Sequence, residues 1–420
     1  MTRTLAATLF SIALLAPAGK AHATLKLSAE ARLRLDSYDN AQLIRGIDYR
    51  QELFRGIVGA DFRFNQHLRI FGEIGTGQVE GRRSTAAANL QNAASLQQLY
   101  FEARGQVGSS ELTATLGRQE FADGPRQLLS VGDGSNLHRT WNGLRLSAQG
   151  KSLRLGAFDL RLTRPLRGSF DEEINHDERI QGINASLAIT AEGWMKTSLD
   201  PFWFHTRKPD FRSGGLVGLD DRYTLGVRFQ GSRGRLKFDW TLARQSGDFT
   251  GRDVDAWGVF AVQSIALSDK GWKPRLTSHV DIASGGGSYG VGTLRRFNQL
   301  YASSGYLGDG QFLSLSNLLL VAPGISVTPT PKTTLSFELG FARRLNEGDA
   351  AYAGGMRPYA ATQNISGHDI GNLLRIGASW APVKNVNLTF NFERLIVGDL
   401  LQRAQLPSGS YASVGATIKY

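Results

Sequence analysis

Apolar and polar residues alternate with a period of two over long stretches of the chain. Between Leu25 and Asp36, every odd position is apolar and every even position is polar or charged. Similar alternation recurs over Phe54–Phe64, Arg222–Phe229, Leu335–Phe341 and Val386–Glu393. A helix would repeat its apolar residues every 3.6 positions. The pattern therefore predicts strands with one apolar and one polar face.

The breaks between these segments differ in length. Short breaks are predicted at Asn65–His67, Gly105–Ser110, Gln149–Lys151, Ala191–Gly193, Gly231–Gly234, Ser268–Lys273, Pro323–Lys332 and Pro382–Asn385. Longer polar breaks are predicted near 37–51, 76–97, 120–139, 163–181, 207–221, 246–254, 285–312, 344–370 and 395–410. The two kinds alternate, which predicts 18 strands with both termini on the short-turn side. Weak patterns near 182–190, 196–206, 255–266 and 313–322 leave 16 strands as the alternative.

An even number of strands, short turns on one side and long loops on the other are typical of outer-membrane barrels. The segments are long enough for a tilted membrane crossing, whereas strands of soluble proteins average about 5–6 residues. The longest apolar run after the N-terminal segment, around Leu318–Val321, is too short for a membrane helix. We therefore predict an all-β fold, a single antiparallel transmembrane β-barrel with short periplasmic turns and long extracellular loops. A secreted soluble β protein is the alternative.

The N-terminal segment has the features of a secretory signal peptide. Arg3 gives it a positive start, Leu5–Leu15 form an apolar core, and Ala21-His22-Ala23 matches a small-x-small cleavage site. A buried N-terminal helix is the alternative, although no capping residue or polar face accompanies the segment. We predict a signal peptide over residues 1–23, cleaved after Ala23, and one outer-membrane barrel domain over residues 24–420.

Composition excludes several classes of protein. The chain has no cysteine, which excludes a lipid-anchored lipoprotein, a disulfide framework and a thiol nucleophile. The formal net charge is +11, but most basic residues lie within predicted strands and not in an exposed tail, so we expect no nucleic-acid partner. The H-E-x-x-H motif does not occur, and the histidines are scattered. We expect no enzyme activity, no cofactor and no metal.

The polar face of the predicted strands is rich in arginine. By strand parity, the arginines that face the lumen and are candidates for contacting anions are Arg32, Arg34, Arg55, Arg63, Arg69, Arg104, Arg145, Arg154, Arg222, Arg228, Arg275 and Arg375. Guanidinium stays charged and binds carboxylates with two parallel hydrogen bonds. Rings of such groups select for anions.

Acidic residues share the same face. They are Glu30, Asp61, Glu73, Glu102, Asp239, Asp281, Glu338 and Glu393. Cross-strand pairs between arginine and carboxylate brace a polar wall. Any single arginine therefore has two interpretations, bracing the wall or contacting a solute. A collective positive bias of the lumen is the stronger expectation.

The C-terminus ends in an aromatic residue, Tyr420. The positions Ser413, Gly415, Ile418 and Tyr420 resemble the terminal signature that outer-membrane barrels present to their insertion machinery. The resemblance implies that this machinery and the outer-membrane lipids are partners of the chain. We expect a monomer.

Several segments resemble the bacterial alginate export family of outer-membrane porins. They are Leu116–Phe121, Arg139–Leu146, Tyr223–Arg228, Pro274–Leu276 leading to Ala283–Gly285, Arg296–Tyr301 and Phe392–Asp399. The chain departs from the expected pattern at Gly286-Gly287, where we would expect an acidic residue. The resemblance implies an 18-stranded barrel with an arginine-rich pore for an anionic polysaccharide.

These observations predict a passive outer-membrane channel for anionic saccharides or polyuronates of the alginate type. Uptake of other small organic solutes through the same wall is one alternative. An outer-membrane enzyme or adhesin anchored by the barrel is another. Among the long loops, Gly285–Gln311 is the first candidate to fold into the pore, because it is among the longest and contains Arg295 and Arg296.

Overall fold

A computed structural model describes residues 23–82, 86–122, 127–191 and 195–420. The predicted signal peptide lies outside these residues, apart from Ala23, so the cleavage site and the boundary of the mature domain stay predictions. Most of the predicted turn at Ala191–Gly193 also lies outside them. No helix among the described residues is long and apolar enough to cross a membrane.

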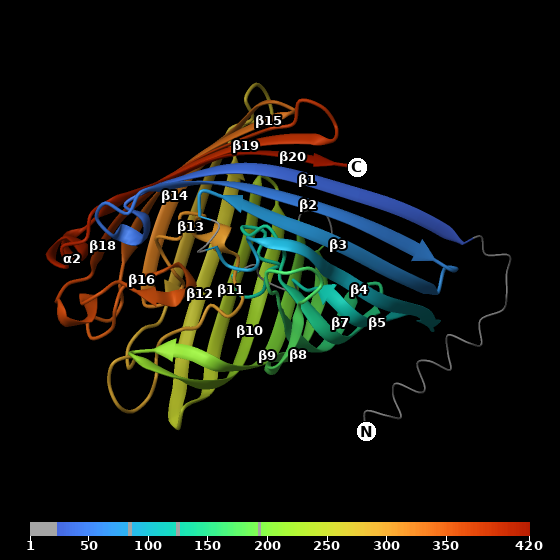
Figure 1. The fold of residues 1–420 in the computed structure, drawn as a ribbon, viewed down its shortest axis with the longest axis horizontal. Helices are drawn as coiled ribbons and strands as arrows, with labels where there is room; N and C mark the ends of the chain where they lie inside the picture. The colour runs from blue at the N-terminus through green and yellow to red at the C-terminus, as the bar shows by residue number, and fades with distance from the viewer. Residues whose placement is uncertain (1–22, 83–85, 123–126, 192–194) are drawn as a thin grey trace.

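The described chain forms one closed antiparallel sheet of 18 strands. Its strands are β1 (Thr24–Asp39), β2 (Tyr49–Arg63), β3 (Leu68–Glu80), β4 (Asn92–Val107), β5 (Ser110–Glu120), β6 (Thr140–Gln149), β7 (Leu153–Arg164), β8 (Glu173–Ala191), β9 (Met195–Ser213), β10 (Leu216–Arg233), β11 (Leu236–Phe249), β12 (Arg252–Ala266), β13 (Arg275–Ala283), β14 (Leu318–Thr330), β15 (Thr333–Arg343), β18 (Asp369–Trp380), β19 (Val386–Val397) and β20 (Gly409–Lys419). Consecutive strands pair, and β1 also pairs with β20, which closes the barrel (Figure 1). The prediction of 18 strands is confirmed.

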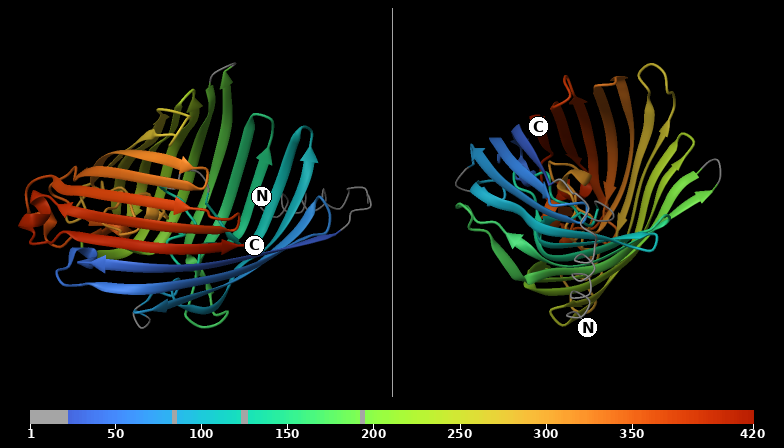
Figure 2. Two further views of the ribbon diagram at one scale, coloured as in Figure 1. Left: turned by 90° about the horizontal axis from the view of Figure 1, so that it is seen from above. Right: turned by 90° about the vertical axis from the view of Figure 1, so that its right-hand side faces the viewer.

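The remaining elements lie in the loops. They are the short helices η1 (Ala41–Leu43), η2 (Ser304–Tyr306), η3 (Gly354–Met356), η4 (Thr362–Asn364) and α2 (Asp399–Arg403), and a small hairpin of β16 (Tyr352–Ala353) and β17 (Arg357–Pro358). All of them belong to the connections that alternate with the short turns along the chain. Figure 2 shows parts of these connections inside the barrel.

The alternation of residues places apolar side chains on the outside of the barrel. Leu27, Val58 and Leu225 are 63%, 61% and 62% exposed, and Phe390 is 40% exposed. Within the alternating stretches of these strands, charged residues lie on the opposite face, because a Lys or Arg on the lipid side of the bilayer centre costs about 2–4 kcal/mol. The predicted orientation of the two faces is confirmed.

Two of the predicted long loops were wrong. Gly214–Gly215 join β9 to β10, and Thr250–Gly251 join β11 to β12. These four residues have φ values of 56°, 85°, 51° and 83°, which are typical of type I′ hairpin turns. The segments 207–221 and 246–254 are therefore mostly strand. Their polar sequences lack an apolar face, as expected for strand ends that project beyond the lipid.

The turn predicted at Pro323–Lys332 is also shorter than expected. β14 continues to Thr330, so only residues 331 and 332 connect it to β15. Pro323 lies within this strand, at a position whose partner on β13 is Ser278. A proline inside a strand lacks the N–H that would donate to a neighbouring strand.

Part of the inner wall is apolar, which the sequence interpretation missed. Phe158, Phe204 and Phe260 face inward from β7, β9 and β12 and are 7%, 0% and 0% exposed. They form one cluster with Phe297 and Tyr301 of the loop 284–317. The lumen is therefore not ionic throughout, because a loop that folds inward needs apolar wall residues to pack against.

Candidate functional site: the arginine-lined lumen

Three loops fold back and contact the inner wall. The loop 284–317 donates the Tyr306 hydroxyl to Asp281 on β13 at 2.6 Å, and its Asp309 and Gly310 N–H groups donate to Glu393 on β19, each at 2.8 Å. The structure thus agrees with the expectation that this segment enters the lumen. Residues 127–139 of the loop 121–139 are also packed inside, as is the loop 344–368, with Leu128 and Tyr352 only 0% and 2% exposed.

Two arginines, Arg32 of β1 and Arg55 of β2, bind groups of the loop 121–139. The side chain of Arg32 donates to the backbone oxygens of Asp133 and Ser135 at 2.8 and 2.5 Å. Arg55 donates to the Asp133 carboxylate at 2.7 Å and pairs with Glu30. Arg34 pairs with Asp36 at 2.8 Å. We call Arg32 and Arg55 the loop-covered arginine cluster.

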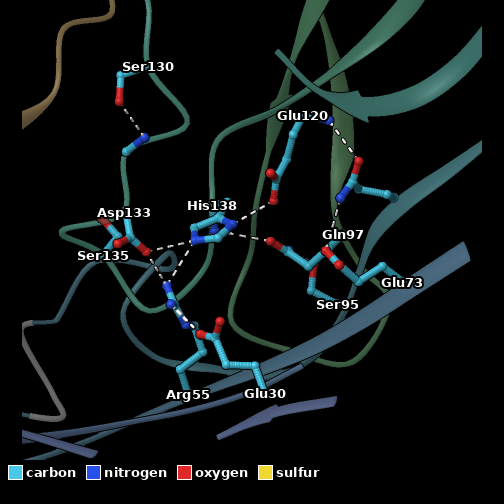
Figure 3. A network of polar contacts seen from close by, with 12 residues as sticks. Glu30, Arg55, Glu73, Ser95, Gln97, Glu120, Ser130, Asp133, Ser135 and His138 are labelled. Carbon is cyan, nitrogen blue, oxygen red and sulfur yellow. Dashed lines mark hydrogen bonds and ion pairs between the residues drawn. The ribbon is translucent and has the colours of Figure 1, made fainter. Parts of the chain in front are cut away.

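A histidine completes this network, as Figure 3 shows. His138 contacts Glu120 through Nδ1 at 2.5 Å and Asp133 through Nε2 at 2.9 Å. Burial lowers the pKa of His138, but the hydrogen bonds to the two carboxylates outweigh it and raise this pKa to about 9. Burial opposes ionisation of Asp133, yet His138 and Arg55 hold its pKa well below the usual range. The charged network therefore fixes the loop to the wall at neutral pH.

A second group of arginines lies nearer the short-turn end of β2 to β6. Asp61 is shared by Arg63 and Arg69, at 3.3 and 2.7 Å, and Glu102 is shared by Arg69 and Arg104, at 3.6 and 2.7 Å. The strand register places Arg145 level with Thr115, which is itself level with Glu102. We call Arg63, Arg69, Arg104 and Arg145 the short-turn arginine cluster.

This second cluster has more positive than negative charge. Four guanidinium groups share two carboxylates, and Arg145 has no carboxylate within 4.0 Å among the described residues. Its guanidinium lies 5.9 Å from the centre of the Phe121 ring. The side chains of Arg63, Arg69 and Arg104 are 45%, 19% and 37% exposed. The guanidinium groups of this cluster therefore have more N–H donors than the two carboxylates use, and they lie in an accessible part of the lumen.

The other predicted lumen residues are dispersed around the wall. Arg222 is fully buried against Asp220, at 2.8 Å, and beneath the loop 284–317, so its guanidinium meets protein and not the open lumen. Arg228 pairs with Asp239 at 2.6 Å, and Arg275 donates to Ser264 at 3.2 Å. Arg154 is at the short-turn end of β7, opposite Gln149. Glu73 accepts from Gln98 at 3.2 Å.

A cavity of about 340 Å³ lies in the lumen beside β13, β15, β18 and β19. Its lining includes His279, Glu338, Arg375 and Glu393. Arg375 pairs with Glu338 at 3.4 Å and donates to the backbone oxygen of Tyr306 at 3.1 Å. This side of the lumen is therefore more acidic than the short-turn arginine cluster.

Three residues of the terminal signature, Ser413, Gly415 and Ile418, lie on β20, and Tyr420 follows the strand. Ser413 is buried on the inner side, whereas Ile418 and Tyr420 are 54% and 85% exposed. A Cβ on Gly415 would be 2.7 Å from the Thr389 hydroxyl, so the close cross-strand contact favours glycine. The N–H of Tyr420 donates to Ala29 at 2.8 Å, next to the closing β1–β20 seam. The proposed role of these residues in insertion stays a prediction.

Sequence reasoning missed the loop residues of the site. Asp133 and His138 lie in a segment without periodicity, and nothing in the sequence indicates which wall residues they meet. The described residues contain no group of three or more His, Cys, Asp or Glu side chains suited to a metal ion.

The closed sheet, its apolar exterior and the inward loops define a porin-type channel of the outer membrane. The sequence matches the model of the alginate export family over residues 23–414, nearly the whole chain. The chain therefore belongs to the alginate export family. A search of curated proteins found no match.

Solved structures with the same fold include proteins of Pseudomonas aeruginosa, among them the outer-membrane protein OpdK. OpdK with vanillate is similar to this chain with a TM-score of 0.60 and 14% identity, over 94% of this chain and 98% of that one. OccK2 (OpdF) in complex with glucuronate has a TM-score of 0.60 and 13% identity, over 94% and 97%. OccK5 (OpdH) has a TM-score of 0.57 and 11% identity, over 94% and 97%. At these identities the likeness shows the fold.

Proposed function

We propose that this channel passes anionic saccharides or polyuronates of the alginate type, and that the short-turn arginine cluster gives it its preference for anions. The observation that carries the proposal is the excess of guanidinium groups in this cluster, four against two carboxylates. Each shared carboxylate leaves N–H donors free to bind a passing carboxylate. Membership of the alginate export family supports the same class of solute.

The arrangement suits release as well as binding. Conduction through a pore requires sites that bind an ion weakly enough for it to leave. Because Asp61 and Glu102 compete for the same guanidinium groups, a solute carboxylate would exchange with them and not be trapped. A polyuronate carries one carboxylate per sugar, so successive contacts along β2 to β6 would guide it.

Uptake of other small organic anions is the second candidate. Two of the similar structures were solved with carboxylates, vanillate and glucuronate. A passive pore has no intrinsic direction, so the same wall serves export and uptake. The proposal concerns the sign and chemistry of the solute, and the alternative differs from it only in solute size.

Reversal potentials in planar bilayers test the proposal. With a gradient of potassium chloride, we expect the unmodified channel to prefer chloride, because a positive lumen attracts anions. The triple variant Arg63→Glu, Arg104→Glu, Arg145→Glu should lose or reverse that preference. Arg244→Gln is the control, since this side chain is 73% exposed and pairs with Asp255 away from the cluster. Unchanged selectivity in the triple variant would refute the role of the cluster.

A further inference from the structure

A cavity of about 480 Å³ lies at the loop end of the barrel. It is enclosed by the turn between β9 and β10, by the loop 284–317 and by the segment 355–358. The arginines of the two lumen clusters are not among its lining residues. The cavity is thus separate from the site described above, and its volume is typical of small-molecule sites.

Arg296 is the most distinctive residue of this cavity. It is only 1% exposed, yet no carboxylate among the described residues lies within 4.0 Å of its guanidinium. The guanidinium carbon lies 5.3 Å from the centre of the Phe211 ring and 4.8 Å from that of Tyr352. One nitrogen donates to the backbone oxygen of Arg212 at 2.8 Å, whereas Nε has no hydrogen-bond partner in the described protein.

A second buried polar group in the same cavity also lacks a partner. Ser213 is 2% exposed, and its hydroxyl has no hydrogen bond within the described protein. Buried polar groups are nearly always paired, because leaving one unpaired costs free energy. Two such groups lining one cavity indicate a ligand with acceptor oxygens.

The rest of the lining shows what kind of ligand fits. Arg212 and Arg357 add positive charge and Asp210 adds one negative charge. Lys208 is paired with Glu178 at 3.4 Å, and Asp220 with Arg222 at 2.8 Å, so with Arg296 the lining keeps an excess of positive charge. Apolar side chains complete the wall, among them Phe211, Leu216, Leu300, Met356 and Pro358. An anion with an apolar body would satisfy both parts of this lining.

We propose that this cavity binds a small organic carboxylate with a flat apolar body, of which benzoate is the simplest example. Its carboxylate accepts hydrogen bonds from Arg296 and Ser213, and its ring packs against Phe211 and Met356. The site captures the solute at the extracellular mouth before the lumen. That place in transport rests on the second candidate function, uptake of small organic anions, whereas the binding itself does not.

Isothermal titration of the purified full chain in detergent tests the binding, with benzoate, acetate and glucuronate as probes. We expect benzoate to bind at least about tenfold more tightly than acetate, because it buries a ring. Glucuronate has the same charge but a polar body, so it should bind more weakly than benzoate. Equal affinity for acetate, or tighter binding of glucuronate, would overturn the assignment.

Variants locate the site. Arg296→Gln should weaken benzoate binding about tenfold, as expected for a lost charge-assisted hydrogen bond. Arg357→Gln, at an exposed position that will not disturb folding, should weaken it by a smaller factor of about three. Arg295→Gln is the matched control, because Arg295 is adjacent to Arg296, exposed and outside the cavity. This variant loses the same charge but keeps the cavity, so its apparent affinity includes any partitioning of benzoate into the detergent micelles.

The result separates this site from the proposed function. If Arg296→Gln does not fold, the Arg357→Gln variant tests the site instead. Benzoate affinity of Arg357→Gln equal to that of Arg295→Gln would then refute the site. Arg296→Gln should leave the reversal potential in potassium chloride unchanged, because the short-turn arginine cluster is intact. Loss of benzoate binding with retained chloride preference is therefore the expected pair of results.

Discussion

The two arginine clusters of the lumen have the same strand parity but different surroundings. In the loop-covered arginine cluster, Arg32 and Arg55 are 10% and 4% exposed and bind groups of the loop 121–139. In the short-turn arginine cluster, Arg63 and Arg104 are 45% and 37% exposed and share carboxylates of the wall itself. Parity decides which side of the sheet a side chain faces. The loops decide whether it meets solute.

The comparison gives the two clusters different roles. Guanidinium groups that fix a loop cannot also bind and release a passing anion. We therefore assign anchoring to Arg32 and Arg55, and solute contact to the short-turn arginine cluster. The predictions below test this division, beginning with the largest expected effect.

Removal of the covering loop should make the loop-covered arginine cluster accessible to solute, as the short-turn arginine cluster already is. Replacing residues 127–136 by three glycines takes away Asp133 and exposes Arg32 and Arg55. We expect single-channel conductance to rise roughly twofold or more, and chloride preference to increase, because a wider lumen gains free cations. Planar-bilayer recording measures both. Unchanged conductance would show that the loop does not narrow the conducting path.

Charge reversal should affect the loop only in the loop-covered cluster. Arg55→Glu places a carboxylate beside Glu30 and Asp133, so we expect backbone amides such as those of Leu137 and Arg139 to lose hydrogen-exchange protection by at least about tenfold. These amides bond to Asn89 and Val131 in the intact loop. Arg63→Glu is the matched comparison and should leave their protection unchanged. Equal loss in both variants would remove the distinction between the clusters.

Alkaline pH should release the loop through His138. Because its pKa in the folded protein is raised to about 9, the stabilisation by protonated His138 is complete below about pH 6.5, the unperturbed value, and is lost as pH rises through 9. We expect loop protection to fall between pH 7 and pH 10. The His138→Gln variant should show a smaller change over this range, after correction for the intrinsic pH dependence of exchange. A similar fall in that variant would mean that another group titrates.

The smallest effect should come from a single neutral substitution in the short-turn cluster. Arg104→Gln removes one of four cations, while Glu102 keeps its contact with Arg69 at 3.6 Å. We expect the ratio of chloride to potassium permeability to fall by less than about twofold, since one charge in a screened, hydrated lumen contributes little. Reversal potentials measure this ratio. A complete loss of selectivity would mean that Arg104 alone sets it.

Local pattern was sufficient for much of the fold. Leu27, Val58 and Phe390 face outward as their two-residue period predicts, because lipid penalises the opposite register. The two-residue turns at Gly214–Gly215 and Thr250–Gly251 were not predicted, although both end in glycine. The strand ends beside them are polar, and this polarity was interpreted as a long loop. A glycine-containing pair between extended segments is the feature that could have identified them.

The candidate site was less predictable because it depends on tertiary contacts. Arg55 and Arg63 lie eight residues apart on one face of β2, and no local property distinguishes them. Their difference comes from Asp133, 78 residues from Arg55 in the chain. Likewise, Phe158 and Phe204 face inward, although we expected an ionic lumen. They pack against apolar residues of the loop 284–317, and the sequence of the strands alone does not indicate that this loop lies there.

Thiol accessibility tests the central claim most directly, because the chain has no cysteine of its own. Arg63→Cys and Arg32→Cys each introduce a single thiol, and a small anionic methanethiosulfonate reagent reports how readily it is reached from the pore while current is recorded. We expect Cys at position 63 to react at least about tenfold faster than at position 32, with a change in conductance as it does so. Equal rates would contradict the division between covered and open arginines.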